Sequence, residues 1–474
     1  MSEARARRSK AIFAAAVYLQ VFALLFELAC PRSLLPELSS VLLLGALALR
    51  LACGGAARLR WLVRTPTLLL AAYTALDLLS FMRSEPQLFR MKYRVVAVCA
   101  FTAFCLALAL TDGGVTLSGI YLTSCSAGMS AAFAALLDRF LLHFSDTQYT
   151  ERITLRNDYN MYATVLLCAA IGGLGALLAR PPTAWRYAAF FASAAFLGGM
   201  AYLSGSRRIF MAQLPAGLLF VLAAVRSCIL RVPQKAGKTD GTAPRRARAA
   251  VSLGAAAVSA IIFTAAAAAV AARLPALLET KKPPLQEGSA AATGETTLLE
   301  RYESLDGGGA FETRRALWGA ALGELRRMSA HPAALLFGRG GGYDIALYDR
   351  LLESGADERL SKTFGDAEKY RGKLSAHNFL LSDMLCGGAV KLALALALCA
   401  ALAVSALRAA LSSFREGLPC AMLLATALVN SFISNRFGLL YDRYFWIGAM
   451  LLVFITAKTH EGGDWRHEKI GQGC

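Results

Sequence analysis

The sequence predicts an all-α polytopic membrane protein with about twelve transmembrane helices and one large extracytoplasmic loop between spans nine and ten. Three observations indicate this class. Of the 474 residues, 56% are hydrophobic, and the mean hydropathy is +0.48. Apolar runs of roughly 20 residues, the length that crosses a bilayer, recur between short polar breaks. None of these runs alternates apolar and polar residues as barrel strands do, so helices are the expected spanning form.

The apolar runs define the predicted spans in order along the chain. The basic segment 1–10 leads directly into the first run without an obvious small-residue cleavage site, so this run is predicted to be a retained helix. The predicted division is 1–272 for spans one to nine, 273–376 for the large loop, and 377–474 for the last three spans and a tail. The spans are expected at 11–30, 36–53, 66–82, 93–111, 114–137, 161–179, 186–203, 209–228, 250–272, 378–406, 417–434 and 440–457.

The distribution of Lys and Arg predicts the orientation. Segments that face the cytoplasm collect these residues, and the most basic break is RVPQKAGKTDGTAPRRAR at 231–248. Both termini are therefore predicted to be cytoplasmic. The segment RSEPQLFRMKYR at 83–94 is the exception, with four basic residues in a predicted outer loop. The same bias accounts for the net charge of +18, and no basic stripe with interleaved aromatic residues indicates nucleic-acid binding.

The sequence indicates neither a metal site nor a cofactor. Most of the eleven cysteines lie inside apolar runs, and no Cys-x-x-Cys pair occurs, so neither a zinc site nor a disulfide framework is predicted. No Asp-x-Asp motif occurs either, so the usual metal-dependent diphosphate clamp is not expected. Asp77 lies within an apolar run. A charge buried in a membrane is costly, which favours a function for Asp77, but the sequence assigns none.

The large loop begins at Arg273 and divides into three parts by composition. Residues 280–297 are rich in Pro, Gly, Ser and Thr, which is typical of a flexible linker. Residues 310–330 place Leu317, Ala321 and Leu325 at helical spacing opposite a charged face, which predicts an amphipathic helix lying at the membrane surface. Residues 331–344 have the glycine density of a tight turn.

Four polar elements are predicted to meet at the outer surface, where guanidinium groups could bind phosphate oxygens. A simpler interpretation of each also stands. Arginines at helix ends often only reach lipid headgroups, His377 could be a hydrogen-bonded interfacial ring, and His331 could only begin a turn. The four elements are the entry to span six with Arg152, Arg156 and Asn160; the turn SGSRR with Arg207 and Arg208; the loop with Arg314, Arg315 and His331; and His377-Asn378 before span ten.

These motifs together resemble the O-antigen ligase and O-antigen polymerase superfamily of bacterial membrane glycosyltransferases. His377-Asn378, nine residues and then Gly388 resemble the family's His-Asn-x9-Gly signature. Ser206-Arg207 resembles its Ser-Arg turn. The further matches are Arg152 with Asn160 and Ala163, and the loop stretch Arg314, Trp318, His331-Pro332 and Gly338-Arg339-Gly340. The likeness covers residues 150–450, and Lys391 stands where family members often carry a small residue.

The resemblance implies glycan transfer at the outer face of the bacterial cytoplasmic membrane. The donor would be a glycan on undecaprenyl diphosphate. The acceptor would be a sugar hydroxyl, on the lipopolysaccharide core for a ligase or on another lipid-linked glycan for a polymerase. Arg152 and Arg207, with Arg208, are the candidates for stabilising the departing diphosphate. His377 is the candidate base for the acceptor hydroxyl, with Asn378 orienting the ring or the sugar.

Other functions remain open at this stage. Ligase and polymerase share these motifs, so the sequence does not separate them. A flippase for lipid-linked glycans would carry charged residues near the bilayer midplane and a repeat relating two halves, but the charges here gather at one face and no clear repeat is present. A non-catalytic scaffold of envelope assembly is the third possibility. In every case membrane lipids are expected partners.

Overall fold

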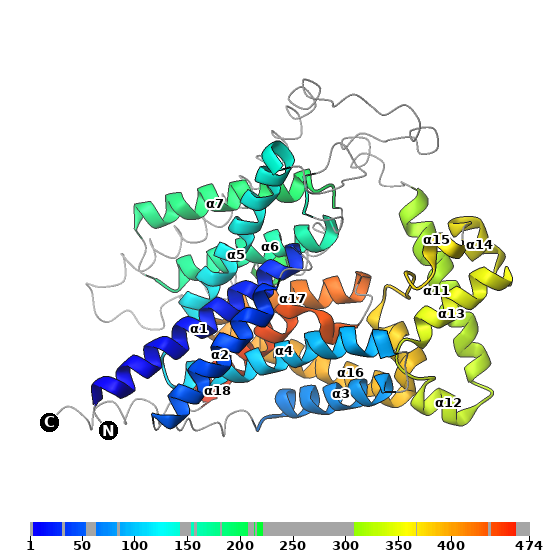
Figure 1. The fold of residues 1–474 in the computed structure, drawn as a ribbon, viewed down its shortest axis with the longest axis horizontal. Coiled ribbons are helices and arrows are strands. Elements are labelled where there is room, and N and C mark those ends of the chain that lie inside the picture. The colour runs from blue at the N-terminus through cyan, green and yellow to red at the C-terminus, as the bar shows by residue number, and fades with distance from the viewer. Residues whose placement is uncertain are drawn as a thin grey trace, which may run out of the picture. The chain divides into compact units, whose positions relative to one another are not determined.

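The structure is a computed structural model, and every regular element is a helix over the residues that it describes (Figure 1). These residues are 3–30, 34–53, 63–82, 86–142, 153–155, 159–180, 183–206, 213, 216–220, 308–365, 367–434 and 438–460. The all-helical class expected from the sequence is therefore confirmed for this part of the chain.

Ten of the twelve predicted spans coincide with described helices. The spans predicted at 209–228 and 250–272 lie largely or wholly outside the described residues, so the total of twelve stays a prediction. Within the described part, six helical segments are long and apolar enough to cross a membrane. They are α1 (Glu3–Ala29), α2 (Leu35–Ala52), residues 92–111 of α4 (Pro86–Thr111), α5 (Leu117–Leu137) with its π-helical extension (Asp138–Leu142), α6 (Tyr159–Leu178) and α16 (Phe379–Ser412).

The chain divides into two compact units, of which the first comprises Met1–Cys53, Gly113–Leu305 and Ala409–Thr426. Its main contacts join α1 to α2, α5 to α6, and α6 to α7 (Ala184–Leu203). Small residues allow the closest approach. A side chain added at Gly172 would lie 2.7 Å from the backbone oxygen of Tyr121 on α5, so only glycine fits there. Such small-residue contacts are typical of helix pairs in membranes.

The second unit comprises Gly54–Asp112, Asp306–Arg408 and Ala427–Cys474. It holds the long helices α3 (Thr65–Phe81), α4 and most of α16, together with α18 (Arg443–His460), which packs on α4. The helix α17 (Gly417–Ser434) contributes its C-terminal half, and a 3₁₀ turn (Leu439–Tyr441) precedes α18. The start of α3 follows a general rule, since Pro66 occupies its first turn, where a backbone N–H is not needed.

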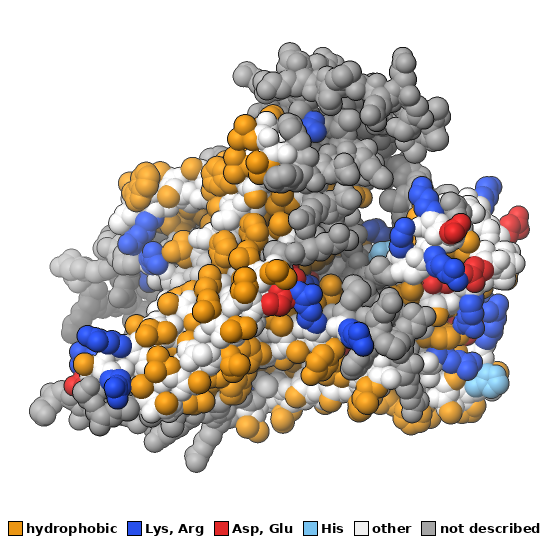
Figure 2. Space-filling view, in the orientation of Figure 1, with side chains coloured by type: hydrophobic (Ala, Val, Ile, Leu, Met, Phe, Trp, Pro, Cys, Tyr) orange, Lys and Arg blue, Asp and Glu red, His pale blue; other side chains and the backbone are white. Residues whose placement is uncertain are grey.

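The C-terminal part of the predicted loop folds into five helices around a hydrophobic core that also includes Leu385 of α16. They are α11 (Gly308–Met328), α12 (Pro332–Phe337), α13 (Tyr343–Ser354), α14 (Glu358–Phe364) and α15 (Ala367–Tyr370). Figure 2 shows that charged side chains gather over this group of helices, whereas hydrophobic side chains dominate the visible face of α1 and α2. The linker predicted at 280–297 lies outside the described residues.

Two expectations about this unit require correction. Leu317, Ala321 and Leu325 do line one face of α11, but this face packs into the core shared with α13, α14 and the start of α16, so it is not left to lie on a membrane surface. The predicted outer loop 83–94 is also too long, because α4 already begins at Pro86 and Lys92 is buried within it.

Candidate functional site

The segment that enters α16 carries the most unusual backbone of the second unit. Among the described residues, His377 is the only non-glycine residue with a positive φ, of +47°. A side chain in this left-handed region costs roughly 1–2 kcal/mol. The ring is half-buried. Strain of this kind persists where the surrounding contacts impose it, and it gathers at functional sites.

The residues on either side of His377 fix its backbone. The side-chain Oδ1 of Asn378 accepts hydrogen bonds from the backbone N–H groups of Leu380 and Leu381, at 3.0 and 3.3 Å. It therefore caps the first turn of α16. On the other side, Nε1 of Trp318 donates to the carbonyl of Ala376 at 3.0 Å. The side-chain oxygen of Asn378 thus makes a helix cap, and its expected role in orienting the ring or a sugar stays a prediction.

Trp318 links two stretches of the predicted site. It belongs to α11, where Arg314 lies one helical turn earlier on the same face. The side chain of Arg314 is half-buried, and that of Arg315 is exposed. His331 is exposed too, and it immediately precedes the short helix α12 without capping it through its side chain. His331 thus follows a turn at residues 329–330 and begins a helix, and its supporting role in the site stays a prediction.

A glycine loop, residues 338–342, joins the loop helices to α16. Gly388 interrupts α16 with φ of +69° and ψ of −167°. This conformation is essentially confined to glycine. The backbone N–H groups of Arg339 and Gly340 donate to the carbonyls of Leu385 and Cys386, each at 2.9 Å. The loop thus completes the broken helix.

The same loop also reaches α3. The N–H of Gly341 donates to the carbonyl of Ser80 at 2.7 Å, near the end of that helix. Close packing explains two of the glycines singled out in the sequence. A side chain at Gly338 would meet the backbone of Cys386, and one at Gly388 would meet the carbonyl of Leu336. At residues 338 and 388 the backbones of the glycine loop and of α16 therefore pack directly against each other.

A cluster of buried charges lies on α3, α4 and α16 directly beyond this loop. We call Asp77, Lys92, Asp383 and Lys391, together with Tyr73, the charge cluster. Nζ of Lys391 contacts both carboxylates, that of Asp77 and that of Asp383, the latter at 2.8 Å. Nζ of Lys92 lies 2.6 Å from Oδ2 of Asp77, and the hydroxyl of Tyr73 donates to Asp383 at 2.6 Å.

The charge cluster is internally compensated. Its charged side chains are at most 3% exposed, and two lysines balance two aspartates. A buried charge without a partner costs several kcal/mol, so the arrangement is stable only as a complete set. The sequence drew attention to Asp77 and to the unusual Lys391, but it gave no sign that Asp383 and Lys92 are their partners.

The loop helices reach α16 through side chains as well. The carboxylate of Asp344 on α13 accepts from the hydroxyl of Ser382 at 3.0 Å, and Sγ of Cys386 lies 3.6 Å from its other oxygen. Tyr343, the first residue of α13, donates to Glu324 of α11 at 2.6 Å. Burial and this hydrogen bond raise the pKa of Tyr343. The loop helices are therefore tied together just beside the entry to α16.

The first unit holds the other part of the predicted constellation. The hydroxyl of Ser206 donates to Oδ1 of Asn160 at 2.8 Å, and the N–H of Ile153 donates to the carbonyl of Leu203 at 3.0 Å. The turn after α7 and the segment before α6 thus meet at one end of these helices. The predicted diphosphate ligands Arg152, Arg207 and Arg208, and the supporting Arg156, lie outside the described residues.

The predicted site residues that the structure describes thus belong to two different compact units. His377, Asn378, Arg314 and His331 belong to the second unit, and Asn160 belongs to the first. No family model matches the sequence, and no curated protein matches it.

Proposed function

We propose that this protein is an O-antigen ligase-like glycosyltransferase of the bacterial cytoplasmic membrane, which moves a glycan from undecaprenyl diphosphate to an acceptor sugar hydroxyl at the outer face. The observation that carries the proposal is the strained, half-buried His377 at the start of α16, between the hydrogen bond from Trp318 and the cap by Asn378. The proposal includes twelve spans, cytoplasmic termini and an extracytoplasmic site.

The proposed chemistry needs few groups. A sugar on a polyprenyl diphosphate already carries a good leaving group, so the enzyme has to accept a proton and stabilise negative charge. A neutral imidazole, whose ordinary pKa is about 6.5, accepts the proton of the attacking hydroxyl. The oxygen of that hydroxyl bonds to the anomeric carbon, the bond to the diphosphate breaks, and a single displacement inverts the anomeric centre. No metal ion takes part in this scheme.

Arginines take the second role in the proposal. Arg152 precedes Ile153 and Arg207 follows Ser206 in the sequence. The contacts of Ile153 with Leu203 and of Ser206 with Asn160 join the two backbone segments that carry these arginines. This supports one shared diphosphate site for Arg152, Arg207 and Arg208. Arg156, Arg314 and His331 are the supporting residues of the proposal.

The proposal is tested by transfer of a glycan from a purified lipid-linked donor to an acceptor, in detergent. His377→Ala and Arg207→Ala should each reduce the rate by at least about a hundredfold, in line with the loss of a general base or of a charge-stabilising group. EDTA should leave the wild-type rate unchanged. The matched control is Arg359→Ala, which removes an exposed arginine from α14 and should retain most of the activity. A fully active His377→Ala protein would refute the proposed base.

The acceptor separates the two activities within the proposal. A deletion strain of a polymerase would lose chain extension, whereas a deletion strain of a ligase would accumulate full-length lipid-linked polymer. Gel analysis of the lipid-linked and the core-linked glycans distinguishes the two outcomes.

A second candidate is favoured by the charge cluster, because ionisable residues inside spanning helices are frequent in transporters. Under this alternative the protein would flip a lipid-linked glycan. Wild-type protein in liposomes would then move the lipid between leaflets without joining sugars, and substitution of Lys391 would stop the movement while that of His377 would not.

A further inference from the structure

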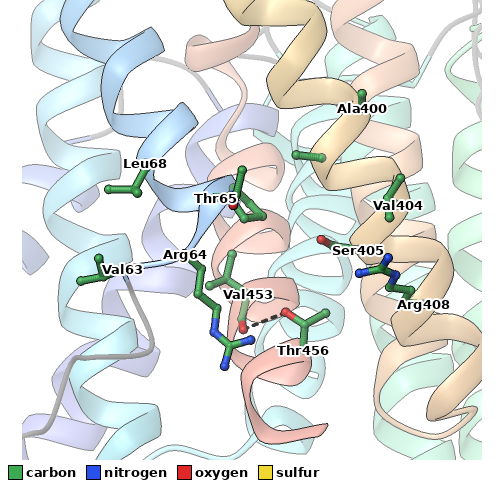
Figure 3. Close-up of a pocket in the computed structure, with 12 residues that line it drawn as sticks. Val63, Arg64, Thr65, Leu68, Ala400, Val404, Ser405, Arg408, Val453 and Thr456 are labelled. Carbon is green, nitrogen blue, oxygen red and sulfur yellow. Dashed lines mark hydrogen bonds between the residues drawn. The ribbon is translucent and has the colours of Figure 1, made fainter. Parts of the chain in front are cut away.

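A cavity of about 690 Å³ lies among α3, α16 and α18 of the second unit (Figure 3). Its walls are the start of α3, the stretch of α16 around residues 400–408, and α18 at Val453 and Thr456. It lies far along α16 from His377, twenty-three residues or more in the sequence, and none of its lining residues belongs to the proposed glycan site.

The lining has a consistent charge. Two arginines, Arg64 and Arg408, contribute to the wall, and none of the described lining residues is acidic. Thr65, Ser405 and Thr456 line it as well, and the hydroxyl of Thr456 donates to the carbonyl of Leu452 on its own helix at 2.9 Å. Figure 3 shows the guanidinium of Arg408 beside Ser405, and that of Arg64 extending from the start of α3 along α18. Two guanidinium groups at one space, with Thr65 and Ser405 beside them, form a site for an anion with several oxygens, such as a phosphate.

The start of α3 adds to this preference. Arg64 is the N-cap residue, in an extended conformation, and no described side chain caps the helix. Pro66 has no backbone N–H, so Thr65 and Thr67 supply the first-turn N–H groups that have no partner within the helix, and these favour an anion. The start of α3 adds to the attraction of the two guanidinium groups for an anion. By itself it would not form a binding site.

The rim of the cavity is apolar. Val63 is 71% exposed, Leu68 56% and Val404 48%, and all three line the cavity. Of the helices that form it, α16 is apolar and long enough to cross a membrane. A free anion would gain nothing from these side chains, whereas an acyl chain attached to the phosphate would cover them.

We infer that this cavity binds an anionic membrane phospholipid, with its phosphate between Arg64 and Arg408 and its acyl chain along Leu68 and Val404. Basic pockets between spanning helices bind acidic headgroups in this way. A phospholipid without a headgroup cation fits best, because the described lining offers no carboxylate to receive an ammonium group. On the predicted topology the lipid belongs to the cytoplasmic leaflet.

The test uses the full-length protein in detergent, titrated with phosphatidylglycerol or phosphatidylcholine and examined by native mass spectrometry. Wild-type protein should retain one phosphatidylglycerol in preference to phosphatidylcholine. The double variant Arg64→Gln/Arg408→Gln should weaken this binding at least about tenfold, through loss of charge-assisted hydrogen bonds. The matched control is Arg186→Gln, which removes a half-buried arginine from the first turn of α7, outside the cavity.

A second variant keeps the inference testable if the double variant folds poorly. Ser405→Leu fills the cavity and removes no charge, and it should also release the lipid. Unchanged retention of phosphatidylglycerol in a folded variant of either kind would overturn the inference. Full displacement of the lipid by millimolar inorganic phosphate would overturn it too, because the site would then belong to a soluble anion.

Discussion

The entry to α16 and the charge cluster, which α16 shares with α3 and α4, hold their polar groups in opposite ways. In the charge cluster every charged group has an opposite charge within 2.8 Å, and nothing charged is more than 3% exposed. At the entry, His377 is half-buried on a strained backbone. Buried charges that are all paired indicate a structural role. A strained backbone beside a partly exposed side chain indicates a chemical role. Substitutions in the two regions test this contrast, and they differ in the size of the expected effect.

Replacing Lys391 by methionine should have the greatest effect on stability. The substitution leaves the carboxylates of Asp77 and Asp383 buried, with Lys92 as the remaining cation, so we expect a loss of about 3–5 kcal/mol. The measurement is thermal unfolding in detergent, together with the yield of folded protein. Lys362→Met, at an exposed position of α14, is the control and should change little. A Lys391→Met protein as stable as wild type would mean that the cluster is not structural.

Replacing Gly388 by alanine should cost about 1–3 kcal/mol, because the conformation at this position is essentially confined to glycine. A side chain there would also meet the carbonyl of Leu336. Amide exchange in the glycine loop reports on this substitution more specifically than the free energy of unfolding does. The amides of Arg339 and Gly340 should exchange with deuterium much faster once their acceptors move away. Gly323→Ala is the control, since a side chain at that position of α11 meets nothing within 4 Å. Unchanged exchange at both amides would contradict the proposed docking of the loop.

Two substitutions of His377 separate strain from chemistry. Both His377→Gly and His377→Val remove the imidazole, so both should abolish glycan transfer if the proposed function holds. They should differ in stability by about 1–2 kcal/mol in favour of glycine, because a left-handed backbone is costly for a side chain and costs glycine little. Unfolding curves of the two proteins check the difference. Equal stability would argue against a left-handed backbone at this position.

Replacing Trp318 by phenylalanine should have the smallest effect. The ring is retained, but the hydrogen bond from Nε1 to the carbonyl of Ala376 is lost. Loss of one such bond costs about 0.5–1.5 kcal/mol. Because this bond fixes the residue before His377, the substitution should clearly lower the rate of glycan transfer. It should change the unfolding temperature only slightly. Trp185→Phe, which changes a tryptophan that is 78% exposed, serves as the control. Equal changes in the transfer rate of the Trp318→Phe and Trp185→Phe proteins would show that Trp318 does not support the site.

Much of the fold could be predicted, because long apolar runs and basic breaks depend only on local composition. The charge cluster could not. Asp77 and Lys391 are separated by 314 positions, and no local pattern reveals which helices are neighbours. Lys92 was assigned to a loop because the topology rule treats each lysine as a marker of a loop. The spacing on α11 predicted its helix correctly, but a periodic stripe is the same whether it faces lipid or protein.

The candidate site was predictable only in part, for a related reason. The types of its residues are visible in the sequence, and so is the order of the motifs that carry them. The left-handed backbone of His377 has no sequence signal, because the contacts that impose it come from Trp318 and Asn378. The cap by Asn378 follows a general preference for asparagine at a helix start, and the predicted contact of this side chain with the ring or a sugar stays a prediction.

The hydrogen bonds from the glycine loop to α16 have a consequence for the order in which the protein folds during synthesis. The ribosome makes α3 and residues 338–341 before it makes Leu385 and Cys386. The donors at Arg339 and Gly340 therefore already exist when the interrupted turn of α16 is synthesised, and the carbonyls of Leu385 and Cys386 can bond to them at once. The glycine loop thus stabilises a helix that is synthesised after it.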